Sequence, residues 1–196
     1  CGPLISYRDK DEYVKYSCGI KASPLEVRID SANPRRVLGE IQVKGDAVML
    51  GYYNNEEATK ATFTPDGWLK TGDMGVIDED GCLFIKGRTK CMILGPSGQN
   101  IYPEEVETVL NSQPYVVESL VVEDNGGLTA LIYPDFQQGA KDGMSQDAFI
   151  RYIEGLLPEL NKELPNYAKL KKIEVMSEDF ERTPKKSIKR YLYQRN

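Results

Sequence analysis

Apolar and polar residues alternate in short runs along the first part of the chain. The runs at residues 25–29 and 39–45 are bounded by proline, asparagine and glycine, and this pattern is typical of β-strands. Residues 54–60 differ, because asparagine precedes two glutamates there, which indicates the capped start of a short helix. The pattern therefore predicts a β-rich, barrel-like subdomain over residues 1–88.

After residue 88 the pattern changes to one that mixes helices with strands. Apolar residues recur at helical spacing in two segments, and strand-like runs flank Asn125-Gly126-Gly127, which is a hairpin signal. The predicted elements are helices at residues 103–112 and 146–157 and strands at residues 116–122, 128–133 and 173–176. They predict a small mixed α+β domain over residues 89–196, so the fold class expected for the chain is α+β.

Three large aromatic residues, Tyr52, Tyr53 and Trp68, lie on either side of the predicted short helix. Such side chains bury a large apolar area, so we expect them to pack in or near the core rather than to contact a ligand. The segment Asp78-Glu79-Asp80-Gly81 has the composition of a hairpin turn. Its acidity alone does not predict a calcium site, which needs further oxygen ligands at loop spacing.

Composition and charge narrow the classes of function. The chain has 196 residues, 40% of them hydrophobic, and a net charge of −5, which suits a globular protein and predicts no nucleic-acid partner. No apolar run approaches the roughly 20 residues that a transmembrane segment needs.

Four cysteines without metal-ligand spacing and the absence of histidine predict no metal site. We expect a cytoplasmic protein with reduced thiols and leave the oligomeric state open. Because the chain begins with Cys1, we expect it to be a piece of a longer protein.

Charged residues and glycines are most densely grouped between residues 70 and 107. Thr71-Gly72-Asp73 is expected to present a carboxylate on a tight turn, and Gly87-Arg88-Thr89-Lys90 presents two cations directly after a predicted strand. A carboxylate can accept hydrogen bonds from both hydroxyls of a sugar diol, and a guanidinium can reach the same sugar or a phosphate. These residues indicate a nucleotide site, with an ordinary surface ion pair between Asp73 and Arg88 as the alternative.

Four segments in this region resemble successive signature motifs of one enzyme superfamily. They are GEIQVKGDAVMLGYYN (39–54), DGWLKTGD (66–73), IKGRTKCMI (85–93) and GQNIYPEEVE (98–107). Together and in this order they resemble the adenylate-forming superfamily, which includes acyl-CoA synthetases, the adenylation domains of peptide synthetases and the luciferases. The resemblance covers nearly the whole chain but only about the last third of a typical member, and it looks closest to long-chain fatty acid–CoA ligases.

The resemblance implies roles for particular residues. Nucleotide binding is implied for Asp73, Arg88 and Ile85, a hinge between two domain orientations for Lys90, and contact with coenzyme A for Gly98 and Ser97. ATP, Mg2+ and coenzyme A are the implied cofactors and cosubstrates.

The basic tail, residues 182–192, contains the one departure from the family pattern. In the family a lysine directly before an isoleucine stabilises charge during adenylate formation, whereas here Ser187 precedes Ile188. Lys186 is the candidate catalytic residue, because a long lysine side chain can offset a shift of one residue. The alternative is a protein that adenylates poorly.

The implied function is that of an ATP-dependent ligase fragment. The intact parent would activate a carboxylic acid, expected to be a fatty acid, as an acyl-adenylate and transfer it to coenzyme A, while the fragment alone is expected to be inactive. Two alternatives stay open: an adenylation domain that loads a carrier-protein thiol, and a non-catalytic nucleotide-binding relative, for which Ser187 is the argument.

Overall fold

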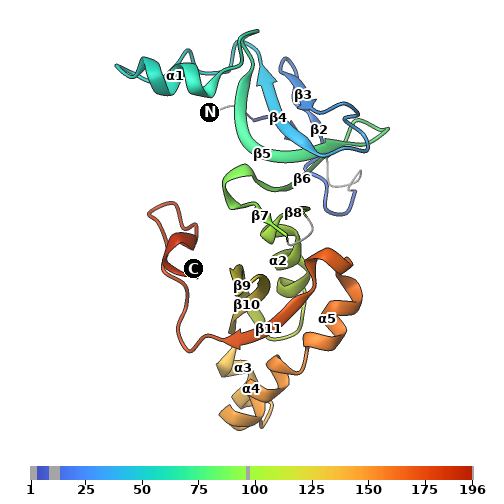
Figure 1. Cartoon of the computed structure of the whole chain (residues 1–196), viewed down its shortest axis with the longest axis vertical. Helices are drawn as coiled ribbons and strands as arrows, with labels where there is room; N and C mark the ends of the chain where they lie inside the picture. Colours follow the sequence, from blue (N-terminus) through green and yellow to red (C-terminus); the bar gives the residue numbers. More distant parts are fainter. Residues whose placement is uncertain (1–3, 9–13, 96–97, 196) are drawn as a thin grey trace. The chain divides into compact units, whose positions relative to one another are not determined.

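The computed structural model describes residues 4–8, 14–95 and 98–195. The chain divides into two units, Cys1–Cys91 and Met92–Asn196, each with its own sheet (Figure 1). Several sheets and few helices confirm the α+β class predicted from the sequence.

A curved antiparallel sheet is the framework of the first unit, and its strand order is β3-β4-β5-β6 (Figure 1). The strands are β3 (Glu26–Asp30), β4 (Gly39–Lys44), β5 (Leu69–Ile77) and β6 (Leu83–Arg88). A short pair, β1 (Ser6–Tyr7) and β2 (Ile20–Lys21), continues the sheet beyond β6 through a bridge between Ile20 and Cys82. The turn predicted at Asp78-Glu79-Asp80-Gly81 joins β5 to β6 and is closed by a bond from the Gly81 amide to the Asp78 carbonyl.

The core of this unit forms where alternate strand residues point to one face of the sheet. Ile29, Ile41 and Leu83 are buried there. Helix α1 (Glu56–Thr62) begins as predicted, with the Asn55 side chain accepting from the Ala58 amide.

The expectation of core packing is wrong for two of the three aromatic residues. Tyr52 is 49% exposed and Tyr53 is 94% exposed, because they belong to the segment between β4 and α1 and not to a strand. Trp68 is half-buried, as expected.

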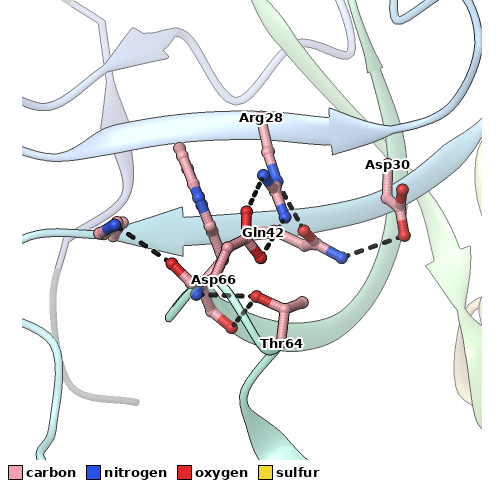
Figure 2. A network of polar contacts seen from close by, with 7 residues as sticks. Arg28, Asp30, Gln42, Thr64 and Asp66 are labelled. Carbon is pink, nitrogen blue, oxygen red and sulfur yellow. Dashed lines mark hydrogen bonds and ion pairs between the residues drawn. The ribbon is translucent and has the colours of Figure 1, made fainter.

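A polar network ties the segment before β5 to β3 and β4, as Figure 2 shows. The Arg28 guanidinium donates to both carboxylate oxygens of Asp66 at 2.7 and 3.2 Å, and its Nε donates to Gln42 at 2.7 Å. Gln42 is buried and donates to Asp30. The guanidinium also lies over the Trp68 ring, 4.4 Å from the ring centre, where a cation is attracted to the aromatic face. Arg28 therefore fixes the approach of the chain to β5.

The second unit is built on a three-stranded sheet of order β11-β10-β9. Its strands are β9 (Val116–Asp124), β10 (Gly127–Pro134) and β11 (Leu170–Val175). β9 and β10 form the hairpin predicted at Asn125-Gly126-Gly127, and Asn125 and Gly126 take the positive φ angles that such a turn requires. β11 joins β10 in parallel after a helical crossover.

Helices cover one face of this sheet. They are α2 (Pro103–Asn111), α3 (Phe136–Lys141), α4 (Gln146–Glu154) and α5 (Leu157–Glu163). Their apolar side chains, with Phe149, Ile153 and Leu160 among the most buried, form the larger core with β9, β10 and β11. The part of the chain that the structure describes has no helix long and apolar enough to cross a bilayer.

The helix predicted over residues 146–157 is shorter than expected. It ends at Glu154 with Gly155 as its cap, and α5 starts at Leu157. Glycine weakens a helix interior, and proline favours the first turn of a new helix, which is where Pro158 stands. Helix α3 was not predicted.

The C-terminal segment covers the other face of the sheet. Phe180 is buried against Leu120 and Leu131, and Ile188 and Tyr193 pack around it. Three apolar residues of this segment therefore belong to a second core, while Lys185 and Lys186 stay exposed.

Candidate functional site

Asp73 and Arg88 face each other across β5 and β6. They are directly paired in the ladder, and Arg88 Nε donates to Asp73 Oδ1 at 2.8 Å. Their side chains are 29% and 60% exposed. The tight turn expected at Asp73 is wrong, because this residue lies inside strand β5. The surface ion pair considered as the alternative is present, and it leaves both groups open to solvent.

A bulge in β5 presents Asp73. Thr71, Gly72 and Asp73 stand opposite the single residue Ile41 of β4. The Thr71 hydroxyl donates to the Ile41 carbonyl at 2.8 Å and accepts from the Asp73 amide at 3.0 Å. Gly72 has φ +76°, a left-handed conformation that glycine adopts without strain. Bulges re-aim side chains at functional sites, and this one aims the carboxylate.

Ile85 lies on β6 opposite Gly75 and is 47% exposed. It offers an apolar surface on the same strand as Arg88.

Lys90 lies in a single 3₁₀ turn, η2 (Thr89–Cys91), and is exposed. The two units divide one residue later, between Cys91 and Met92. The connection between the units is therefore short.

The glycine-rich loop connects β7 (Ile93–Leu94) to β8 (Asn100–Ile101). The Gly95 amide donates to the Gln99 carbonyl at 2.8 Å, and the Gly98 amide donates to the Gly95 carbonyl at 2.9 Å. Gly98 has φ +80° and an exposed backbone. Ser97, the other residue assigned to coenzyme A, lies outside the described residues.

A cavity of about 420 Å³ adjoins this loop within the second unit. Polar and charged side chains line it from the glycine-rich loop, from the sheet and from the segment before β11. They include Gln99, Glu123, Lys169 and Lys171, with Gly95 and Gly127 contributing backbone. Sequence reasoning missed the two lysines, because nothing in the local pattern connects them with the loop.

The tail loop is a tight hairpin with Lys186 at its tip. Arg182 and Ile188 form an antiparallel bridge, the Thr183 amide donates to the Ser187 carbonyl at 2.8 Å, and the Lys186 amide donates to the Thr183 carbonyl at 2.8 Å. Lys186 has φ +63° and is exposed. Lys189 instead pairs with Glu181 at 3.0 Å, and this hydrogen bond raises the pKa of Lys189.

The buried residue Glu107 forms an ion pair with the half-buried Arg190, and sequence reasoning missed this pair. Two guanidinium nitrogens of Arg190 meet the two carboxylate oxygens of Glu107, and the Val121 amide donates to Glu107 at 2.8 Å. Burial raises the pKa of Glu107, and the hydrogen bond from Arg190 opposes that rise. One signal existed in the sequence, because Glu107 lies four positions after Pro103 and three before Leu110, on the buried face of α2.

The second unit is where the chain matches a known family. A family described as the AMP-binding enzyme C-terminal domain matches residues 92–196, the same residues as the unit. The chain belongs to this family. Its AMP-binding C-terminal domain thus contains the glycine-rich loop, the cavity and the tail loop, while Asp73 and Arg88 lie in the preceding unit.

Three proteins similar to this chain show the range of its relatives. Long-chain-fatty-acid–CoA ligase FadD15 of Mycobacterium tuberculosis is 34% identical over 78% of this chain and 28% of its own length. Nonribosomal peptide synthetase apvA of Aspergillus terreus is 47% identical over 46% of this chain and 10% of its own length. The structure of O-succinylbenzoate coenzyme A synthetase (MenE) from Bacillus subtilis with ATP and magnesium ion is 33% identical, with a TM-score of 0.73 over 90% of this chain and 35% of that one. The chain therefore spans about a third or less of these relatives.

Proposed function

We propose that this chain is the C-terminal part of an AMP-forming acyl-CoA ligase that activates a fatty acid as an acyl-adenylate and transfers it to coenzyme A. Membership of the AMP-binding family carries the proposal. The fatty-acid substrate is supported by the similarity to FadD15, whereas the similarity to MenE supports only the wider class of carboxylic acids. A cytoplasmic location is part of the same proposal.

In this proposal the Asp73 carboxylate accepts hydrogen bonds from the ribose hydroxyls of ATP, and Arg88 contacts the same ribose or a phosphate. The support is geometric, because Arg88 Nε occupies one carboxylate oxygen of Asp73 and both side chains are open to solvent. Ile85 adds exposed apolar surface on β6 against which a nucleoside could pack.

Lys186 would stabilise the charge that develops on the α-phosphate when the carboxylate attacks it. Its place at the tip of the tail hairpin supports this role, and Lys189 is engaged by Glu181. MenE is a relative solved with ATP and magnesium ion, and Mg2+ would neutralise phosphate charge here as well. Among the described residues no three acidic or cysteine side chains gather as metal ligands would, so we assign no Mg2+ ligand to them.

Lys90 is proposed as the pivot between the adenylate-forming and thioester-forming orientations, because it lies beside the boundary between the units. Gly98 and Ser97 are proposed to contact coenzyme A. The cavity beside their loop supports this role, since Lys169 and Lys171 bring positive charge to it and coenzyme A carries phosphates.

A carrier-protein thiol is the second candidate acceptor. The 47% identity to the peptide synthetase apvA favours it. The chemistry up to the adenylate would be the same, and only the acceptor would differ.

Pyrophosphate exchange tests the proposal. The ligase that contains this chain is incubated with ATP, radiolabelled pyrophosphate and saturated fatty acids of increasing length, and then with either coenzyme A or a phosphopantetheinylated carrier protein. We expect acid-dependent exchange and acyl-CoA formation. Thioester formed only on the carrier protein would establish the second candidate, and no exchange with any carboxylic acid would show a non-catalytic relative.

A further inference from the structure

We propose that Arg182 is a positioning residue that holds the backbone of Lys186 against the sheet of the second unit. This inference rests on the proposed role of Lys186. Arg182 Nη1 donates to the Lys186 carbonyl at 3.2 Å, and Nη2 contacts the Glu118 carboxylate and donates to Asp179 at 3.0 Å. One guanidinium therefore links the loop tip to a strand.

The strand end of this link is rigid. Glu118 lies in β9, where it pairs with Tyr133 in the ladder with β10. The side chains of Arg182 and Glu118 are 32% and 28% exposed, so solvent competes only partly for their interaction. Asp179 adds a second acceptor from the segment that leads into the loop.

The loop end of the link is Lys186, whose backbone conformation is uncommon. Lys186 has φ +63°, which residues with a side chain adopt only where the surroundings enforce it. The Thr183 and Lys186 amides close the turn, and Arg182 binds the carbonyl of the same residue. The direction in which the Lys186 side chain leaves the loop is therefore set by contacts that include Arg182.

Arginine is suited to this task and lysine is not. Its planar group presents five donors in a fixed fork, and here separate nitrogens serve the loop carbonyl and the carboxylates. A lysine could pair with Glu118 as a point charge, but it would not hold the carbonyl in the same fixed geometry.

The chain offers a matched control in Arg195. It also clamps the C-terminal segment to the sheet, with its nitrogens 2.5 and 2.8 Å from Glu174 and 3.0 Å from Asp124. These partners lie at the other end of β9 and on β11. Arg195→Gln therefore removes a comparable clamp without touching the loop.

Hydrogen exchange in the full 196-residue chain tests the positioning itself. We expect Arg182→Gln to speed exchange of the Thr183 and Lys186 amides about tenfold, because local opening becomes easier, and Arg182→Lys to fall between it and the wild type. Arg195→Gln should leave both amides near their wild-type rates. Equal exchange in Arg182→Gln and wild type would overturn the inference, whatever the protein catalyses.

Kinetics in the ligase that contains this chain test the consequence. Arg182→Gln should lower the rate constant for adenylate formation about tenfold or more, with little change in KM for ATP and none in thioester formation from pre-made adenylate. Arg195→Gln should keep the wild-type rate. A loosened loop with unchanged adenylation would overturn the positioning role, whereas absence of pyrophosphate exchange in the wild type would overturn the proposed function instead.

Discussion

At the scale of single residues, the ion pairs of this protein differ in how many carboxylate oxygens the arginine engages. Asp73 and Arg88 meet through one nitrogen and one oxygen and remain partly exposed. Asp66 is held by Arg28 through both carboxylate oxygens, and the Arg28 guanidinium lies over the Trp68 ring. The arginine thus engages one carboxylate oxygen of Asp73 but both carboxylate oxygens of Asp66.

Replacing Asp73 tests the nucleotide site. Loss of a charged hydrogen-bond partner costs about 1.5–3 kcal/mol, so Asp73→Ala in the ligase should raise the Kd for ATP roughly ten- to a hundredfold, measured by calorimetry. Asp66→Ala is the matched control, since it removes another aspartate paired with an arginine in the same unit. Unchanged ATP affinity in Asp73→Ala would contradict the assignment.

Replacing Lys186 tests the catalytic cation. Removing a well-placed electrostatic stabiliser slows a reaction on the order of a hundred- to a thousandfold, so Lys186→Ala should slow adenylate formation by about that factor and spare thioester formation from pre-made adenylate. Lys185→Ala, its exposed neighbour, is the control. A large gain from Ser187→Lys, with little loss from Lys186→Ala, would mean that the catalytic lysine is missing.

Asp66 predicts a pH response that the protein's single tryptophan can report. The hydrogen bond from Arg28, followed by that from Thr64, lowers the pKa of Asp66 from 3.8 to about 2. The lowered pKa means that this contribution to stability is complete above about pH 4 and is lost as the pH falls through about 2. Trp68 fluorescence should change in that window in wild type and not in Asp66→Asn. Identical titrations would refute the link.

At the scale of elements, the sequence predicts regular strands well and their interruptions poorly. The alternation of residues 39–45 and the hairpin at Asn125-Gly126-Gly127 follow from local rules, and both are confirmed. The bulge at Gly72 was expected as a turn, because a glycine at positive φ suits either and only the partner strand decides.

Gly72 should tolerate a side chain poorly for conformational reasons alone. A Cβ there would meet no atom within 4 Å, but φ is +76°, so Gly72→Ala should cost about 1 kcal/mol of unfolding free energy in urea denaturation. Gly75→Ala in the same strand should cost more, because its Cβ would lie 2.5 Å from the Phe84 carbonyl oxygen. The reverse order of stabilities would disprove this account.

At the scale of the whole molecule, the motifs predicted the family, and long-range contacts escaped prediction. Asp73 and Arg88 lie 15 positions apart in one hairpin, within reach of a motif. Glu107 and Arg190 are 83 positions apart and Arg182 and Glu118 are 64 apart, so no local pattern pairs them.

The proposed pivot can be tested by fixing one backbone angle. Proline holds φ near −65°, which is compatible with a 3₁₀ turn such as the one that contains Lys90. Lys90→Pro should therefore lock one orientation of the ligase and impair one half-reaction at least tenfold more than the other. Lys90→Ala controls for the lost charge. Equal loss of both half-reactions would argue against Lys90 as the pivot.

The three-stranded sheet of the second unit also keeps the Lys186 loop and the cavity apart. The loop with Lys186 is attached at Glu118, whereas the cavity reaches Glu123 on the same strand. Strands rise about 3.3 Å per residue, so these five positions correspond to roughly 17 Å. A rigid sheet with the Lys186 loop near one end of β9 and the cavity near the other cannot bring both to the reacting acyl-phosphate group at once. Under the proposed roles, the cation and the thiol would therefore act in succession and not together.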